Sequence, residues 1–255
     1  MAASSEASVP RYAGAAFVAQ FATSLAAGLL SLSVLSGEVG DVIAAADAEA
    51  ARLRVVVILK LLTSIGIIAL TSLLYVALRD TVRWVATIAC ALWLAEATVL
   101  AVSVLGLDAL LDLGGRSAGS GSAASVSDAA VGTFALGLEQ HAGDIAMLFF
   151  SFGALLWYPL FVRTRFVPRW LGSWGLVSVV PVFAATLLHV WNRDLQLSTL
   201  LYAAYVPYEF VVGSWLLVKG SPLRPVATSA RAEPLPPTER PAPGQAHVHA
   251  GRRTP

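Results

Sequence analysis

Three ionisable side chains, Lys60, Glu96 and Glu209, lie inside long apolar segments of this sequence. A charged side chain at the centre of a bilayer is disfavoured by about 2.5–3.5 kcal/mol or more, so such residues usually pair with one another or mark a path for an ion or solute. With a rise of about 1.5 Å per residue, all three lie roughly 10–16 Å from the outer end of their segments. We therefore predict one buried polar site formed by Lys60, Glu96 and Glu209, in which a pair of Lys60 with Glu96 or with Glu209 is geometrically possible.

Two functions are compatible with this predicted site. In the first, which is our leading interpretation, the charges pair only to fix the register of the helices, and the protein is a non-enzymatic integral membrane protein of unassigned biochemical role. In the second, the charges line a path for a proton or a small solute, and the protein is a transporter. Both alternatives remain open from the sequence.

A second group of polar residues is expected near the outer ends of the helices. His141 and Asp144 are three residues apart, which places them on one helix face, and His189 falls near the same edge. Such residues can hold a metal or serve an intramembrane enzyme or regulator, but no third close-spaced ligand supports a metal site. The sequence also lacks the P-loop, zinc-protease and serine-hydrolase motifs. We therefore expect no catalytic residue, no metal and no cofactor.

The composition is that of a membrane protein. Of the 255 residues, 57% are hydrophobic and 13% are charged, whereas soluble domains carry about 25% charged residues. The net charge of +1 argues against a nucleic-acid partner. The single cysteine, Cys90, excludes an intramolecular disulfide and a thiolate metal site. The principal partner is therefore expected to be the lipid bilayer.

Six apolar segments have about the length of 20 residues that a helix needs to cross a bilayer of about 30 Å. They are the run after Tyr12 to Leu35, Val55–Leu78, Trp84–Leu107, Ile145–Val162, Trp170–Trp191 and Ser198–Val218. This pattern predicts an all-α, polytopic six-helix transmembrane bundle over residues 11–220. Residues 1–10 are expected to form a disordered lead, and residues 221–255 a disordered Pro/Arg-rich tail, because they have too few apolar residues to offset the entropy of ordering.

Two connections between these segments carry their own signals. Asp41 can cap a helix that continues through the following alanines into the second segment. Residues 108–128 contain the run GGRSAGSGSAAS and are predicted to be a flexible loop. After this loop, Val131, Phe134 and Leu138 have the spacing of a short amphipathic helix on the membrane surface.

The distribution of basic residues predicts the orientation. With six spans, twelve of the 17 Lys and Arg residues fall on one side and four on the other, with Lys60 inside the membrane. We expect the protein to lie in the plasma membrane. Because basic residues are enriched in cytoplasmic connections, both termini are expected on the cytoplasmic side. The arginines of the tail are also expected to favour anionic lipid headgroups.

Several short motifs give the sequence a family resemblance. Glu96-Ala97 lies in the third segment, Pro168-Arg169 follows the fourth, and the last segment has Glu209 ahead of the run WLLVKG. In the order and spacing of these motifs, residues from about 10 to 220 resemble the bacterial membrane family catalogued as domain of unknown function 4386. The resemblance implies a six-span bacterial membrane protein, and it implies no activity.

Overall fold

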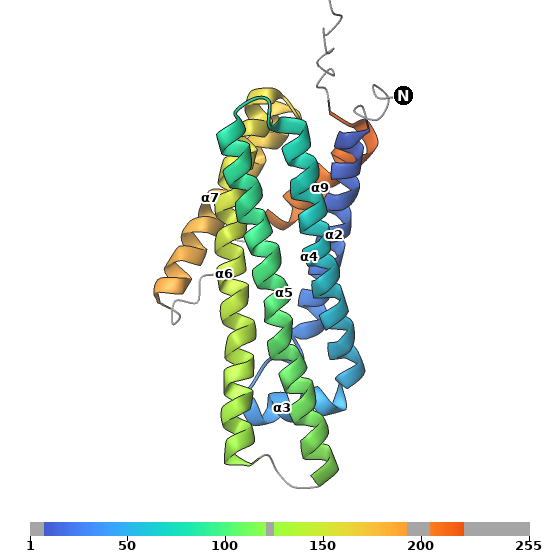
Figure 1. Cartoon of the computed structure of the whole chain (residues 1–255), viewed down its shortest axis with the longest axis vertical. Helices are drawn as coiled ribbons and strands as arrows, with labels where there is room; N and C mark the ends of the chain where they lie inside the picture. The colour runs from blue at the N-terminus through green and yellow to red at the C-terminus, as the bar shows by residue number, and fades with distance from the viewer. Residues whose placement is uncertain (1–7, 121–124, 193–204, 222–255) are drawn as a thin grey trace, which may run out of the picture. The chain divides into compact units, whose positions relative to one another are not determined.

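The structure is a computed structural model that describes residues 8–120, 125–192 and 205–221 (Figure 1). Within these ranges all regular secondary structure is helical, so the predicted all-α fold class is confirmed. The helices are α2 (Val9–Ser31), α3 (Val39–Ala48), α4 (Ala50–Leu78), α5 (Arg83–Ser120), α6 (Val126–Thr164), α7 (Arg169–Trp191) and α9 (Tyr205–Lys219).

Five of the described helices are long and apolar enough to cross a membrane: α2, α4, α5, α6 and α7. The chain is therefore a multi-pass membrane protein. The sixth predicted segment, Ser198–Val218, corresponds in part to α9, whose described residues begin at Tyr205. Residues 198–204 lie outside the described ranges, as do residues 1–7 of the predicted lead and residues 222–255 of the predicted tail.

The prediction of a flexible loop over residues 108–128 is wrong for most of its length. Helix α5 continues to Ser120 and α6 begins at Val126, so only residues 121–124 between them lie outside the described ranges. The extension is stabilised by apolar packing, since Leu110 and Leu113 are buried. Gly114 is a packing residue, because a Cβ atom there would lie 2.7 Å from the backbone nitrogen of Asp47 in α3. A glycine of this run thus allows a close helix contact, which a sequence pattern does not distinguish from flexibility.

The region around α3 and α6 differs from the prediction in two further ways. Helix α3 begins at Val39, two residues before Asp41, and ends at Ala48, so it is a separate helix that does not continue into α4. The amphipathic stretch with Val131 and Phe134 is the first part of α6 and no independent surface helix. Its start is fixed by a capping box in which the Ser125 hydroxyl accepts from the backbone N–H of Asp128 and the Asp128 carboxylate accepts from that of Ser125.

The short connection between α6 and α7 agrees with the predicted segments, which end at Val162 and begin again at Trp170. Helix α6 ends at Thr164, and Arg165 then adopts a left-handed backbone conformation with φ 58°. Helix α7 begins at Arg169, directly after Pro168. A left-handed residue ends a helix and proline favours the start of the next one, so the two helices reverse direction within a few residues.

The helices pack in a ring of neighbours that encloses an aromatic core. Helix α2 contacts α4 and α9, α4 contacts α5, α5 contacts α6, and α6 and α9 both contact α7. The largest fully buried side chains of this core are Trp93, Trp157, Tyr158 and Tyr208. A second cluster of buried aliphatic residues lies where α3 packs against α5 and α6, the region at the bottom of Figure 1.

Helices α2 and α9 approach each other very closely. A Cβ atom on Gly14 of α2 would lie 2.3 Å from the backbone nitrogen of Leu217, and one on Gly213 of α9 would lie 2.8 Å from the Cβ atom of Phe17. Helix association in a bilayer depends on van der Waals packing and interhelical hydrogen bonds, and small residues permit the close approach that this packing requires. These two glycines therefore hold α9 against α2, next to the residues described below.

Candidate functional site

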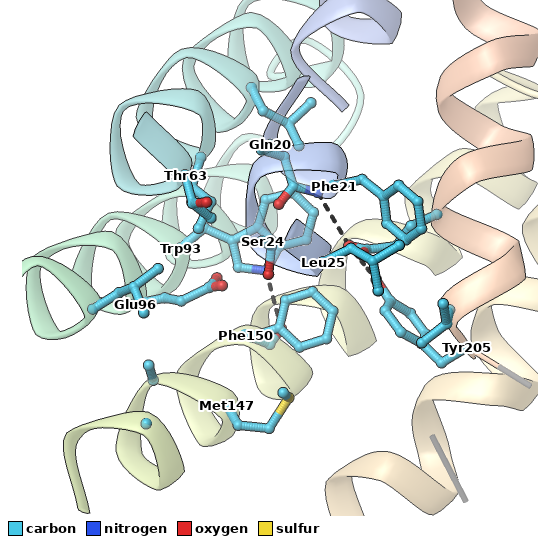
Figure 2. Close-up of a pocket in the computed structure, with 17 residues that line it drawn as sticks. Gln20, Phe21, Ser24, Leu25, Thr63, Trp93, Glu96, Met147, Phe150 and Tyr205 are labelled. Atoms are coloured by element: carbon cyan, nitrogen blue, oxygen red, sulfur yellow. Dashed lines mark hydrogen bonds between the residues drawn. The ribbon is translucent and has the colours of Figure 1, made fainter. Parts of the chain in front are cut away.

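A cavity of about 320 Å³ lies among helices α2, α4, α5, α6 and α9 (Figure 2). Most of its lining is apolar or aromatic, with Trp93, Phe150 and Tyr205 as the aromatic residues that matter below. The polar side chains of the lining, apart from the tryptophan and tyrosine, are Gln20, Ser24, Thr63, Glu96 and Glu209. An apolar cavity with a few convergent polar groups is the usual form of a small-molecule site.

The first acidic residue of the lining, Glu96 on α5, is buried, with 9% of its surface exposed. Its Oε2 atom has no hydrogen-bond partner among the described residues, and Figure 2 shows its carboxylate pointing into the cavity. A buried polar atom without a partner costs about 1–3 kcal/mol, and more when the group is charged. Glu96 therefore has an acceptor whose hydrogen-bonding capacity is unused among the described residues. Because this oxygen is itself fully buried, an occupant of the cavity reaches it only when the Glu96 side chain rotates.

The second acidic residue, Glu209 on α9, is held by hydrogen bonds from two helices. Its Oε1 atom accepts from the Tyr205 hydroxyl at 2.9 Å and from Gln20 Nε2 at 3.3 Å. The Tyr205 hydroxyl is in turn 2.8 Å from the Tyr158 hydroxyl on α6. This chain of contacts links α2, α9 and α6, and it fixes the Glu209 carboxylate at the cavity wall.

Lys60 does not join the two glutamates. Its ammonium forms an ion pair with Glu139 on α6 and donates to the Ser103 hydroxyl on α5 at 3.3 Å. Of the two pairs that depth along the helices allows, Lys60–Glu96 and Lys60–Glu209, neither is formed among the described residues, because Lys60 is paired with Glu139. The fourth predicted segment begins at Ile145, after Glu139, whereas α6 begins at Val126, and this places Glu139 inside the bundle with 14% of its side chain exposed.

The Lys60–Glu139 pair is close to the cavity without lining it. Lys60, Ser103 and Glu139 each lie about one helical turn, roughly 5 Å along the axis, from a residue of the lining. Those neighbouring lining residues are Thr63, Leu100 and Gly143. The three predicted site residues are thus divided between an ion pair and a cavity with two carboxylates.

Two members of the second predicted group, His189 and Asp144, lie close together. The Nε2 atom of His189 on α7 lies 3.7 Å from the Asp144 Oδ1 atom on α6, with both side chains partly exposed. No group of three or more His, Cys, Asp or Glu side chains within residues 8–120, 125–192 and 205–221 is arranged to hold a metal ion. His141 is exposed and lies one turn before Asp144 on the same helix.

The aromatic wall of the cavity is a feature that the sequence did not indicate. The Trp93 indole donates to the backbone oxygen of Phe150 at 3.0 Å, and the two rings stack with centroids 6.1 Å apart. The Phe150 and Tyr205 rings meet edge to face at 5.1 Å. Gly153 makes room for the indole, since a Cβ atom there would lie 2.4 Å from Trp93 Cδ1. The wall is therefore assembled from α5, α6 and α9.

Gln20 and Tyr158 were also missed as site residues. Gln20 is an amide inside the apolar segment of α2, which is the same signal that singled out the three charged residues. Opposite Gln20 lies Gly66 of α4, where an added Cβ atom would be 2.8 Å from the Gln20 Cβ atom. An intramembrane glutamine across from a glycine marks a close helix contact, although the sequence does not say which helices form it.

Comparison with known proteins agrees with the resemblance seen in the motifs. The family described as Domain of unknown function (DUF4386) matches residues 12–220, which include all the residues of the cavity lining named above. No curated protein and no solved structure matches the chain. The matched residues make up most of the sequence, and the chain therefore belongs to the family Domain of unknown function (DUF4386).

Proposed function

We propose that this protein is a six-span transporter of the bacterial plasma membrane that binds a small solute beside Glu96 and Glu209. The observation that carries the proposal is the Glu96 carboxylate, which is buried, faces a cavity and has an oxygen without a partner among the described residues. A residue that only fixes helix register acts through a partner, so register alone does not account for Glu96. Transporters commonly bind their solutes near the bilayer midplane, between helices.

The two alternatives from the sequence apply to different residues. Lys60 and Glu139 form a closed ion pair between α4 and α6, and this favours a role for Lys60 in fixing helix register. Glu96 and Glu209 share a cavity and have no basic residue in its described lining, and this favours solute binding. The proposal therefore gives solute binding to the cavity, and it gives Lys60 the structural role of holding α4 against α6.

The position of the cavity along α5 is consistent with a site inside the bilayer. Glu96 lies about 20 Å along the helix from Arg83, and Ser103 beside the ion pair lies about 30 Å from it. The hydrocarbon core is about 30 Å thick. With Arg83 at one boundary, the cavity is within the membrane and the Lys60–Glu139 pair is near the opposite boundary.

The six-span topology and the location of both termini in the cytoplasm are also part of the proposal. The apolar sequence of α9 extends back to Ser198, which gives a segment of about the length that a bilayer requires. Two basic connections then face the cytoplasm, as the positive-inside rule favours. One contains Arg79 and Arg83, and the other contains Arg163, Arg165 and Arg169.

This orientation predicts the labelling of single cysteines. In a Cys90→Ala background, Ser127→Cys is expected to react with a membrane-impermeant maleimide in intact cells, and Thr81→Cys only after the membrane is permeabilised. Both native side chains are exposed, one at the start of α6 and one in the turn before α5. The reverse pattern contradicts the orientation, and labelling of both cysteines from one side contradicts the crossing of the membrane by α5.

Transport itself is tested by flux in proteoliposomes. Uptake of a panel of small cationic, neutral and anionic solutes, and of protons, is measured against liposomes without protein. Uptake of at least one member is expected, and we expect Glu96→Gln and Glu209→Gln to abolish it. Asp144→Asn, which changes a partly exposed pair away from the cavity lining, serves as the control and is expected to retain uptake. The absence of any flux, or flux unchanged in both Gln variants, contradicts the proposed transport.

A further inference from the structure

We infer that the solute held in this cavity is an organic cation, an amine with one small apolar body whose ammonium group lies between Glu96 and Glu209. The inference rests on the proposed use of the cavity for solute binding, and it adds the chemical class of the solute. It follows from the charge of the lining, from the hydrogen-bonding capacity that remains free, and from the aromatic wall.

The charge of the lining calls for a cationic ligand. Glu96 and Glu209 both line the cavity, whereas no Lys, Arg or His of the described residues does so. The nearest basic side chain on α4, Lys60, is already paired with Glu139. An ionised carboxylate in an apolar site needs a partner of opposite charge. The described lining supplies none, so each carboxyl group is either neutralised by a proton or paired with a positive charge that the ligand brings. The inference describes the second of these states.

The donors of the lining are largely engaged, whereas an acceptor is free. Gln20 and Tyr205 donate to Glu209, and the Trp93 indole donates to the Phe150 backbone. The Thr63 hydroxyl is likewise within hydrogen-bond distance of the Leu59 backbone oxygen and of Thr23. The Oε2 atom of Glu96 is the buried acceptor of the lining without a partner among the described residues. An ammonium group donates and never accepts, so it fits the unused acceptor of Glu96, whereas an anion would find the Ser24 hydroxyl and the second N–H of Gln20 as the donors left in the described lining.

The aromatic wall adds a second attraction for a cation. Trp93, Phe150 and Tyr205 all line the cavity, and their rings contact one another in sequence. A cation within about 6 Å of an aromatic face is attracted to the ring, and the attraction grows when the site is desolvated. The carboxylates and the aromatic rings therefore both favour a positively charged ligand.

The size and polarity of the cavity limit the rest of the ligand. A volume of about 320 Å³ suits a molecule with one ring or a short chain. The lining also includes Leu25 of α2 and Val206 of α9, which are 42% and 38% exposed and lie at the open side of the cavity. The apolar body of the amine is therefore placed along α2 and α9, and its charged end at Glu96.

The inference is tested with a matched series of probes on the purified full-length chain in nanodiscs. The probes are phenethylammonium, neutral 2-phenylethanol and anionic phenylacetate, which share one phenyl ring and differ in charge. Equilibrium binding is measured by scintillation proximity with radiolabelled compounds. We expect phenethylammonium to bind, the alcohol to bind more weakly and the acid not to bind.

Variants identify the groups responsible for the preference. Glu96→Gln and Glu209→Gln are each expected to weaken phenethylammonium binding roughly 30-fold or more, because a buried charge partner is lost. Glu96→Asp, which keeps the charge, is expected to retain part of the affinity, and Asp144→Asn all of it. Size-exclusion profiles and thermal unfolding establish that each variant is folded.

Each result has a definite meaning for the two proposals. No binding of phenethylammonium at millimolar concentration, equal or tighter binding of the alcohol or the acid, or unchanged binding in both Gln variants overturns the cationic assignment. If another solute is nevertheless carried in proteoliposomes, the proposed transport stands without it. If phenethylammonium binds in a Glu96-dependent way and no flux is seen, the ligand class stands and the transport function fails.

Discussion

Replacing Lys60 by methionine is expected to lower the free energy of unfolding by about 3–5 kcal/mol. The substitution removes the partner of Glu139, whose side chain is only 14% exposed, and leaves a buried carboxylate without its counter-charge. It also removes the hydrogen bond to Ser103. The measurement is thermal or denaturant unfolding of the purified protein in detergent, compared with the unsubstituted chain.

The double variant Lys60→Met/Glu139→Leu provides the matched control for this prediction. Replacing both members of a buried ion pair by apolar residues is often neutral or stabilising, so the double variant is expected to recover most of the lost stability. Asp144→Asn, in a partly exposed pair, is expected to change stability by less than about 1 kcal/mol. A double variant no more stable than Lys60→Met contradicts the assignment of this pair to helix register.

The same double variant separates structural support from transport. If Lys60 and Glu139 only hold α4 against α6, a double variant that regains stability also retains solute flux in proteoliposomes. If stability returns and flux does not, the pair belongs to the transport path together with Glu96 and Glu209, and the original grouping of Lys60 with the glutamates is functionally correct.

The second large effect is expected from Gly14→Ala. The added Cβ atom would lie 2.3 Å from the backbone nitrogen of Leu217, 2.7 Å from the carbonyl carbon of Leu216 and 2.8 Å from the backbone oxygen of Gly213. Since all three are backbone atoms, α2 and α9 have to separate. Overpacking of this kind costs about 1–3 kcal/mol or more. The separation also weakens the hydrogen bond from Gln20 to Glu209, which joins the same two helices.

Gly28→Ala is the control for Gly14→Ala, because both glycines lie on α2 and a Cβ atom at Gly28 meets nothing within 4 Å. In this open position alanine is expected to be neutral or to stabilise the helix by up to about 1 kcal/mol. Thermal unfolding midpoints and phenethylammonium binding are compared for the two variants. Equal midpoints for both alanine variants contradict the close approach of α2 and α9.

The parts of the fold that the sequence predicts are those that depend on local composition. A long apolar run becomes a helix because only a helix satisfies its backbone inside lipid, which is why α7 was predicted within one residue of its observed start. The turn after α6 carries arginine and proline, which also act locally. By contrast, the Gly- and Ser-rich end of α5 is helical through its contact with α3, and no local signal reports that contact.

The sequence predicted which residues form the candidate site, and it did not predict which of them contact one another. Glu96 and Glu209 were singled out by their cost in lipid, and both line the cavity. Their separation from Lys60 depends on the start of α6, which brings Glu139 to Lys60. Estimates of depth along single helices do not include the rotation of each helix, and rotation decides which side chains face one another. The aromatic wall depends on the same rotation, and so it emerged only from the structure.

Helices α5 and α6 contain 38 and 39 residues, and at 1.5 Å per residue each is about 57 Å long. A hydrocarbon core of about 30 Å accommodates only about half of that length. With Arg83 at one boundary, as in the proposed placement, the end of the bundle that contains α3 lies outside the hydrocarbon core. One protein is thus exposed to two solvents. The part outside the hydrocarbon core is stabilised by the hydrophobic effect, through burial of Leu110, Leu113 and Ala135, and urea weakens this effect. In the part inside the core, helix association does not depend on the hydrophobic effect. Aqueous denaturants should therefore loosen the α3 end first and leave the cavity intact.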